Sequence, residues 1–203
     1  MATPNQLLQS LVDPEAVLSS SSAIRPTPIQ AHELALVAQK FLEARPDLRK
    51  MHIQFQRHPM RGAYSASPEE KPGSITIGEP SAAIFGHELG HAENLEGAPY
   101  YKTFLGLARN ISNLANALAI PAALATRVFI EDVQSRNQLL NLMTGVTVAA
   151  NAPVLAEELG ATLNALKRSG HKWEDLKVLG PALLSHVANA VIPATSFQIA
   201  RML

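Results

Sequence analysis

The sequence predicts an α+β fold that is mainly helical, with a small sheet beside one central helix and a C-terminal helical bundle. Two short segments, 51–55 and 74–77, have the composition of strands, and residues 82–95 have the apolar content of a core helix. Three long stretches without charged residues then follow: Asn110–Thr126, Asn137–Ala156 and Val178–Ala200. This order, strands first and long helices after them, is typical of an α+β protein.

Length and composition exclude several classes of function. A chain of 203 residues with 47% hydrophobic content fits one domain with a sizeable core. Lys+Arg and Asp+Glu are both 17, so no excess of basic charge points to nucleic acid. The chain has no Cys, which excludes a disulfide framework, a thiol nucleophile and a Cys-bound metal. We expect residues 1–26 to be a loosely ordered lead-in. Residues 27–203 are expected to form a single domain, with the sheet and central helix in 27–97 and the bundle in 98–203.

The N-terminal half shows clear boundaries for its elements. Thr27 and Pro28 begin a helix that runs to about Glu43, and Pro46 ends it. Residues 51–55 alternate apolar and polar side chains, which predicts a half-buried strand. Residues 58–73 are rich in Pro, Gly, Ser and Glu and are expected to form a surface loop before the strand at 74–77.

The strand at 74–77 comes immediately before the central helix. Its residues Ile75, Thr76 and Ile77 could offer an open edge, on which an extended peptide would pair through backbone hydrogen bonds. The alternative is an ordinary sheet strand that covers the core, and the sequence is equally compatible with both.

The central helix carries the most specific motif in the chain, His87-Glu88-Leu89-Gly90-His91. In this HExxH pattern the two His lie one turn apart on one helix face, where both imidazoles can bind one Zn²⁺, with Glu88 as general base. The alternative is a chance motif with two buried, hydrogen-bonded His. Pro80 and Ser81 support a helix start just before it. Gly86 and Gly90 each cost about 1 kcal/mol of helix propensity, which predicts a close approach of another backbone or a substrate.

A catalytic zinc needs a third protein ligand, and no His follows His91 at short range. The third ligand should therefore be a carboxylate, and the candidates are Glu93, Glu96, Glu131, Asp132, Glu157 and Glu158. The pair Glu157-Glu158 stands out, because two helices joined by a turn at 127–136 would return the chain to the motif. The alternative is an acidic first helical turn, which the helix dipole favours.

The segments GHELGHAENLEG, EELGATLNAL and the C-terminal LKVLGPALLSHVANAVIPATSFQIARML resemble, in order and spacing, the YugP-type zinc-dependent membrane metallopeptidases of the gluzincin group. The resemblance covers about residues 50–203. It implies a zincin-like core and identifies Glu158 as the third metal ligand. It also implies that Thr162 occupies the position that supports a metal-bound His. The N-terminal membrane anchor that is usual in this family is absent from the matching part of the sequence.

The motif and the resemblance together predict a hydrolase, specifically a zinc metallopeptidase with Zn²⁺ as its cofactor. A metal-activated water would attack the peptide bond, with Glu88 as the base. Tyr100, Tyr101, His171 and His186 are unranked candidates for stabilising the oxyanion. The alternative is a catalytically weak or inactive gluzincin-fold protein that serves as a structural, assembly or membrane-associated scaffold.

Location and partners follow from the uncharged stretches. Their length matches a bilayer core, but their Asn, Thr, His and Pro residues favour buried or membrane-surface helices. We see no secretory signal and expect a cytoplasmic protein that is soluble or peripherally membrane-associated; the alternative is a multi-pass membrane protein. The expected partners are a peptide or protein substrate and a membrane surface or helical-bundle partner.

Overall fold

The computed structural model describes residues 24–56, 62–65, 73–169 and 173–202. By its contacts the chain divides into two compact units. The first comprises Met1–Lys102 and Leu159–Pro181, and the second Thr103–Glu158 and Ala182–Leu203. The predicted α+β class with predominant helix is confirmed. The prediction of one domain over 27–203 remains a prediction, and the expected lead-in falls almost wholly outside the described residues.

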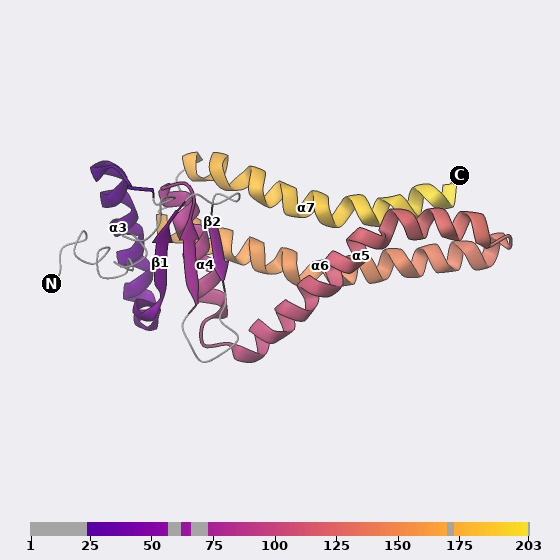
Figure 1. Cartoon of the computed structure of the whole chain (residues 1–203), viewed down its shortest axis with the longest axis horizontal. Helices are drawn as coiled ribbons and strands as arrows, with labels where there is room; N and C mark the ends of the chain where they lie inside the picture. Colours follow the sequence, from indigo (N-terminus) through magenta and orange to yellow (C-terminus); the bar gives the residue numbers. More distant parts are fainter. Residues whose placement is uncertain (1–23, 57–61, 66–72, 170–172, 203) are drawn as a thin grey trace. The chain divides into compact units, whose positions relative to one another are not determined.

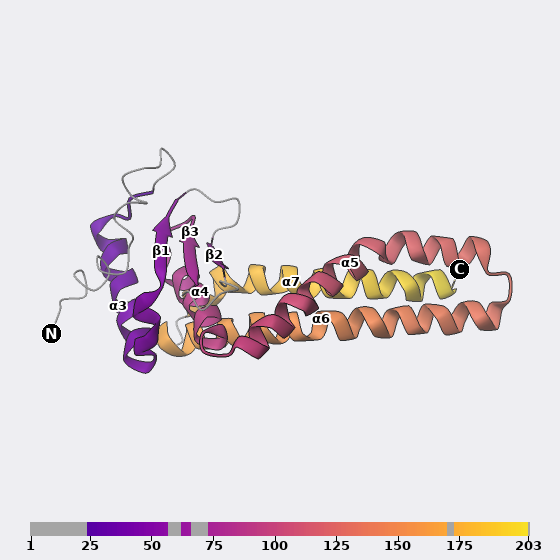
Figure 2. The same ribbon diagram turned by 60° about the horizontal axis from the view of Figure 1, so that its bottom comes forward.

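The first unit contains a three-stranded sheet of β1 (His52–Phe55), β2 (Gly62–Ser65) and β3 (Ser74–Ile77). Figure 2 shows β3 between the other two strands, in the order β1-β3-β2. β3 pairs in parallel with β1 and antiparallel with β2, and Ile77 lies opposite both Phe55 and Gly62. The strands at 51–55 and 74–77 are confirmed, but β2 lies inside the segment 58–73, which we expected to be only a loop.

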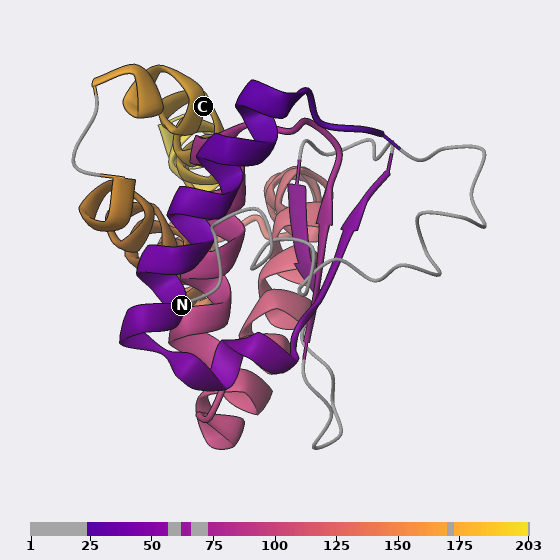
Figure 3. The same ribbon diagram turned by 90° about the vertical axis from the view of Figure 1, so that its left-hand side faces the viewer.

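Helix α3 (Pro28–Ala44) forms where the sequence places it, with a capping box between Thr27 and Gln30 at its start. A short 3₁₀ helix, Pro46–Lys50, connects it to β1. Figure 3 shows α3 and helix α4 (Ala82–Leu95) on one face of the sheet. A single apolar core joins these elements through the buried side chains of Leu34, Phe41, Ile53, Ile75, Ile77 and Phe85. The alternation predicted for 51–55 is therefore the alternation between core and surface.

The second unit is built from parts of three long helices: α5 (Pro99–Phe129), α6 (Val133–Ser169) and α7 (Trp173–Met202). The predicted turn between α5 and α6 is confirmed and spans 130–132. In Figures 1 and 2 the C-terminal part of α7 runs beside the end of α5 and the start of α6. A small core of Ala119, Ala123, Leu140, Phe197 and Ala200 holds them together there.

The interior of this second unit contains polar side chains beside its small apolar core, and many large apolar side chains lie on its surface. Ser112, Thr126, Thr147 and Asn151 are buried. Asn151 accepts a hydrogen bond from the Ser112 hydroxyl at 2.6 Å and donates one to Asn116 at 3.0 Å. Large apolar side chains are instead more than half exposed, among them Leu107, Leu114, Leu118, Leu142, Leu184 and Ile192. Exposed Leu and Ile side chains in this number are unusual for a water-soluble bundle, which buries most of them.

Length and composition alone allow two of the described helices to cross a membrane, over Val133–Arg168 and Glu174–Met202. The expected membrane association is supported to that extent.

Candidate metal centre

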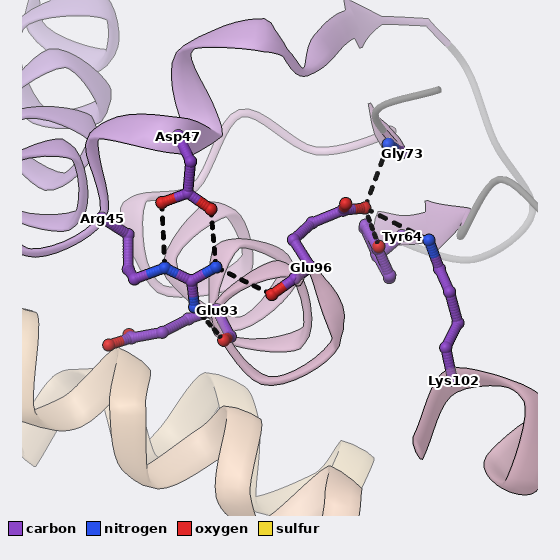
Figure 4. Close-up of polar contacts among 7 residues, drawn as sticks. All are labelled: Arg45, Asp47, Tyr64, Gly73, Glu93, Glu96 and Lys102. Carbon is purple, nitrogen blue, oxygen red and sulfur yellow. Dashed lines mark hydrogen bonds and ion pairs between the residues drawn. The ribbon is translucent and has the colours of Figure 1, made fainter. Parts of the chain in front are cut away.

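The C-terminal end of α4 is held by one arginine from the end of α3. Arg45 donates hydrogen bonds to the backbone carbonyls of Glu93 at 2.5 Å and Glu96 at 2.8 Å, as Figure 4 shows. Its guanidinium also pairs with Asp47 at 2.7 Å, and this contact holds the pKa of the Asp47 carboxyl below its usual value. A cation at the negative end of a helix dipole satisfies carbonyls that lack helical partners. The helix that carries the motif is therefore fixed at its C-terminal end.

The side chain of Glu96 connects the same end of α4 to the sheet. Its Oε1 accepts a hydrogen bond from the Tyr64 hydroxyl at 2.5 Å and another from the backbone N–H of Gly73 at 3.0 Å. Lys102 lies 3.5 Å from the same oxygen (Figure 4). Tyr64 lies on β2, and Gly73 directly precedes β3. Glu96 thus connects α4 to the sheet, and it lies outside the group of His87, His91 and Glu158.

Gly90 lets the backbone of α6 lie directly against α4. A Cβ atom built on Gly90 would lie 2.4 Å from the carbonyl oxygen of Ala161 and 2.9 Å from its Cα. The same atom on Gly86 would meet Ala165 and Val37 at an ordinary 3.5 Å. The predicted close approach is therefore confirmed at Gly90, where the neighbour is backbone. Gly86 is in ordinary contact and does not require the absence of a side chain.

The two motif histidines face each other across one helical turn. The Nε2 atoms of His87 and His91 are 3.0 Å apart, and the rings are nearly perpendicular, at 80°. In the chain alone this contact is a hydrogen bond between imidazoles. Two nitrogens bound at ~2.0 Å to one tetrahedral ion lie about 3.3 Å apart. Only a small separation of the two rings is therefore needed for a metal ion to take the place of the hydrogen bond.

The carboxylate of Glu158 completes a group of three ligand types. Glu158 and Leu159 are consecutive in α6, and helix periodicity places Glu158 one turn before Thr162. One ligand atom each from His87, His91 and Glu158 lies within 4.8 Å of the other two, and Glu158 is buried. Two imidazole nitrogens and one carboxylate oxygen form a ligand set that catalytic zinc sites use. The residues present therefore fit Zn²⁺.

Thr162 contacts the first histidine of the motif. Its hydroxyl oxygen lies 3.3 Å from Nδ1 of His87, while Nε2 of the same ring faces His91. A metal-binding His commonly has a hydrogen-bonding partner at its second nitrogen, which fixes the ring orientation. The geometry agrees with the supporting role that the resemblance implied for Thr162.

Glu88 is buried against strand β2. A Cβ atom on Gly62 would lie 2.7 Å from Oε1 of Glu88, so glycine is needed where the strand passes this carboxylate. Tyr64, two residues along β2, lies with its ring 6.4 Å from the ring of His91 and almost parallel to it. Sequence reasoning missed both residues, because they fall in a segment whose Pro, Gly and Ser content resembles a loop.

The expected open edge at 75–77 is wrong. β3 is paired on both sides, with β1 and with β2, so its backbone hydrogen bonds are already made within the sheet. Among the described residues β2 pairs with β3 alone. β2 is therefore the strand next to Glu88 whose second edge could pair with an extended peptide.

The other carboxylates considered as ligands do not belong to the group. Glu93 pairs with Arg168 at 2.7 Å, and Asp132 accepts a hydrogen bond from the N–H of Ser135 in the exposed turn before α6. The alternative explanation of Glu157 and Glu158, an acidic first helical turn, does not hold, because both residues lie well inside the 37-residue helix α6.

Of the residues considered for oxyanion stabilisation, His186 lies near the candidate ligand Glu158. Its Nε2 lies 3.5 Å from Oε2 of Glu158, whereas Tyr100 is 90% exposed. His171 lies outside the described residues. Comparisons with models of protein families, with curated proteins and with solved structures found no match for this chain.

Proposed function

We propose that this protein is a zinc-dependent metallopeptidase. The observation that carries the proposal is the group of His87, His91 and Glu158, with Glu88 buried beside it on the same helix. These residues come from two helices, α4 and α6, that are far apart in the sequence. If the HExxH motif were there by chance, nothing would require a buried carboxylate of a second helix to lie beside its histidines. Zn²⁺ at this position would act as a Lewis acid on the peptide carbonyl and make water nucleophilic near neutral pH.

The chain's own residues have separate tasks in this reaction. Glu88 accepts a proton from the attacking water and returns it to the leaving amine, which is general base and then general acid catalysis. Thr162 holds the ring of His87 in one orientation through Nδ1. Gly62 lies beside the carboxylate of Glu88, and a Cβ atom at this position would crowd its Oε1 at 2.7 Å.

The substrate strand is expected on β2 in this proposal. An extended peptide could add to its edge through backbone hydrogen bonds, which are independent of the substrate's side chains. Gly62 lies beside Glu88, so such a peptide would pass close to the general base. Ser65 is exposed and Gly62 to Tyr64 are half-buried, which leaves this strand more accessible than β3.

The proposal also takes up the multi-pass alternative: α6 and α7, the two described helices long and apolar enough, would cross a membrane, and the uncharged part of α5 packs beside them. Asn110–Thr126, Asn137–Ala156 and Val178–Ala200 contain no Asp, Glu, Lys or Arg. At 1.5 Å per residue these helical stretches are about 25–35 Å long, which matches a hydrocarbon core of about 30 Å. The exposed Leu and Ile side chains would contact lipid, while the Ser112, Asn116 and Asn151 hydrogen bonds would join helices inside it.

Membrane placement has its own test. After expression of the full chain, the membrane fraction is washed with alkaline carbonate, which removes peripheral proteins. An embedded bundle should stay in the membrane pellet and require detergent for release. Release by carbonate alone would show that the apolar surface is covered by something other than lipid.

Catalysis is tested by Glu88→Gln in the full detergent-solubilised chain. Loss of the base should reduce cleavage of a peptide library by about 10²–10⁴-fold. Zinc content, measured by elemental analysis, should be unchanged because Glu88 is not a ligand. Glu93→Gln is the matched control on the same helix, since Glu93 pairs with Arg168 and lies outside the ligand group.

Two results would contradict the proposal. Wild-type protein that holds no zinc after incubation with it would favour the scaffold alternative. Equal cleavage by wild type and Glu88→Gln would exclude Glu88 as the base.

A further inference from the structure

Two consecutive carboxylates are buried where α6 enters the metal site, and only one belongs to the ligand group. The side chain of Glu157 is fully buried and that of Glu158 is 8% exposed. Adjacent residues of a helix point about 100° apart, so Glu157 cannot share the position of Glu158. Buried carboxylates need a partner of opposite charge, because their desolvation is unfavourable. Glu157 has no role in the proposed reaction, and its burial calls for a separate explanation.

Arg109 of α5 supplies that positive charge to both carboxylates. Its Nη2 lies 3.3 Å from Oε2 of Glu157 and 3.4 Å from Oε1 of Glu158. His186 of α7 lies 3.5 Å from the other oxygen of Glu158. The carboxylate of Glu158 is thus contacted from α5 at one oxygen and from α7 at the other. A free glutamate side chain samples several rotamers, and these contacts select one of them.

We propose that Arg109 is a positioning residue for the third metal ligand, and that Glu157 is present to hold Arg109. The inference rests on the proposed zinc site. Glu157 anchors the guanidinium, and the guanidinium in turn fixes the Glu158 carboxylate in the orientation that faces the histidines. Arg109 itself touches neither substrate nor metal ligand nitrogen in this role; it acts through Glu158.

Whether zinc affinity falls or rises when Arg109 is removed distinguishes a positioning role of Arg109 from an effect of its charge alone. A cation next to a metal ligand repels Zn²⁺, so removal of Arg109 should strengthen zinc binding if charge alone mattered. If Arg109 positions Glu158, its removal should weaken zinc binding. Loss of residues that orient metal ligands typically lowers metal affinity by about 10–100-fold.

The experiment measures zinc affinity in the full detergent-solubilised chain by competition with a chromophoric chelator. Arg109→Gln should lower the affinity by about 10–100-fold. Arg109→Lys, which keeps the positive charge, should recover part of it. Arg168→Gln is the matched control, because Arg168 pairs with Glu93 across two helices without contacting a ligand, and its affinity should match wild type.

A second readout reports the geometry directly. With Co²⁺ in place of Zn²⁺, the visible absorption spectrum depends on the arrangement of the ligands. Arg109→Gln should change this spectrum, and Arg168→Gln should not. If Arg109→Gln fails to fold, Glu157→Gln takes its place, with a smaller expected loss of affinity than complete removal of the guanidinium.

The outcomes distinguish this inference from the proposed function. Wild-type protein without zinc affinity would overturn both. If Arg109→Gln binds zinc as tightly as wild type or more tightly, the positioning role alone is overturned. The same result in Glu157→Gln has this meaning where that variant is used instead. An equal loss in Arg168→Gln would also overturn it, since any broken ion pair would then have the same effect.

Discussion

Replacement of Gly90 by Ala tests whether the backbone contact between α4 and α6 positions the residues of the proposed metal site. The added Cβ would lie 2.4 Å from the carbonyl oxygen of Ala161, where ordinary contact begins at 3.4 Å. The two helices must therefore separate by about 1 Å at this point. Ligand distances in metal sites tolerate about 0.2 Å, so the shift should pull Glu158 away from the histidines.

The energies of this change can be estimated from two opposing effects. Overpacking at a tight contact costs typically about 1–3 kcal/mol. Alanine in place of glycine returns about 1 kcal/mol of helix propensity. The net expectation is a loss of about 0–2 kcal/mol in stability, together with at least a tenfold loss of zinc affinity.

Gly86→Ala is the control for this prediction. Its Cβ would meet neighbours at 3.5 Å or more, so it should keep zinc affinity and gain up to about 1 kcal/mol in stability. Thermal unfolding and zinc competition on both variants provide the assay. If Gly90→Ala binds zinc as tightly as wild type, the helix contact does not control the geometry of the site, and the reasoning is refuted.

Three further predictions concern residues that contact or support α4. Thr162→Val should lower zinc affinity by about 10–100-fold in the same competition assay, because Nδ1 of His87 loses its contact with the Thr162 hydroxyl, and Thr162→Ser should restore the affinity. Arg45→Ala should lower the free energy of unfolding by about 1–2 kcal/mol in thermal denaturation, since two carbonyls at the end of α4 lose a charged donor. An unchanged midpoint would show that water replaces Arg45 without loss. Because the pKa of Asp47 is lowered in the folded state, Asp47 makes a small contribution to the free energy of unfolding. This contribution should be present above its unfolded pKa of about 4 and lost at more acidic pH.

Prediction from sequence succeeded where the controlling interactions are local. The start of α3 depends on Thr27, Pro28 and Gln30, which lie within one turn of each other. Strand β1 alternates because successive side chains of a strand point to opposite faces. The spacing of His87 and His91 needs only the helix repeat, and their Nε2 atoms meet as expected.

Prediction failed where a distant partner decides the structure. β2 consists of Gly62, Ala63, Tyr64 and Ser65, a weak strand sequence that forms because β3 pairs with it. The same pairing removed the open edge that we expected on β3. Nothing local marks Tyr64 as a neighbour of His91, since the aromatic contact depends on how the sheet packs against α4.

The sequence by itself determined the residue types of the proposed metal site, their helical spacing and the charge-free lengths of the C-terminal helices, because these follow from residue identity and the helix repeat. Only the tertiary structure decided that Gly90 and not Gly86 lies against backbone, that Arg109 bridges Glu157 and Glu158, and that the helical unit buries polar groups and exposes Leu. These features depend on contacts between residues 35 or more positions apart in the sequence. Which of many alternative contacts forms is decided by packing of the whole chain, and that information is absent from any short segment.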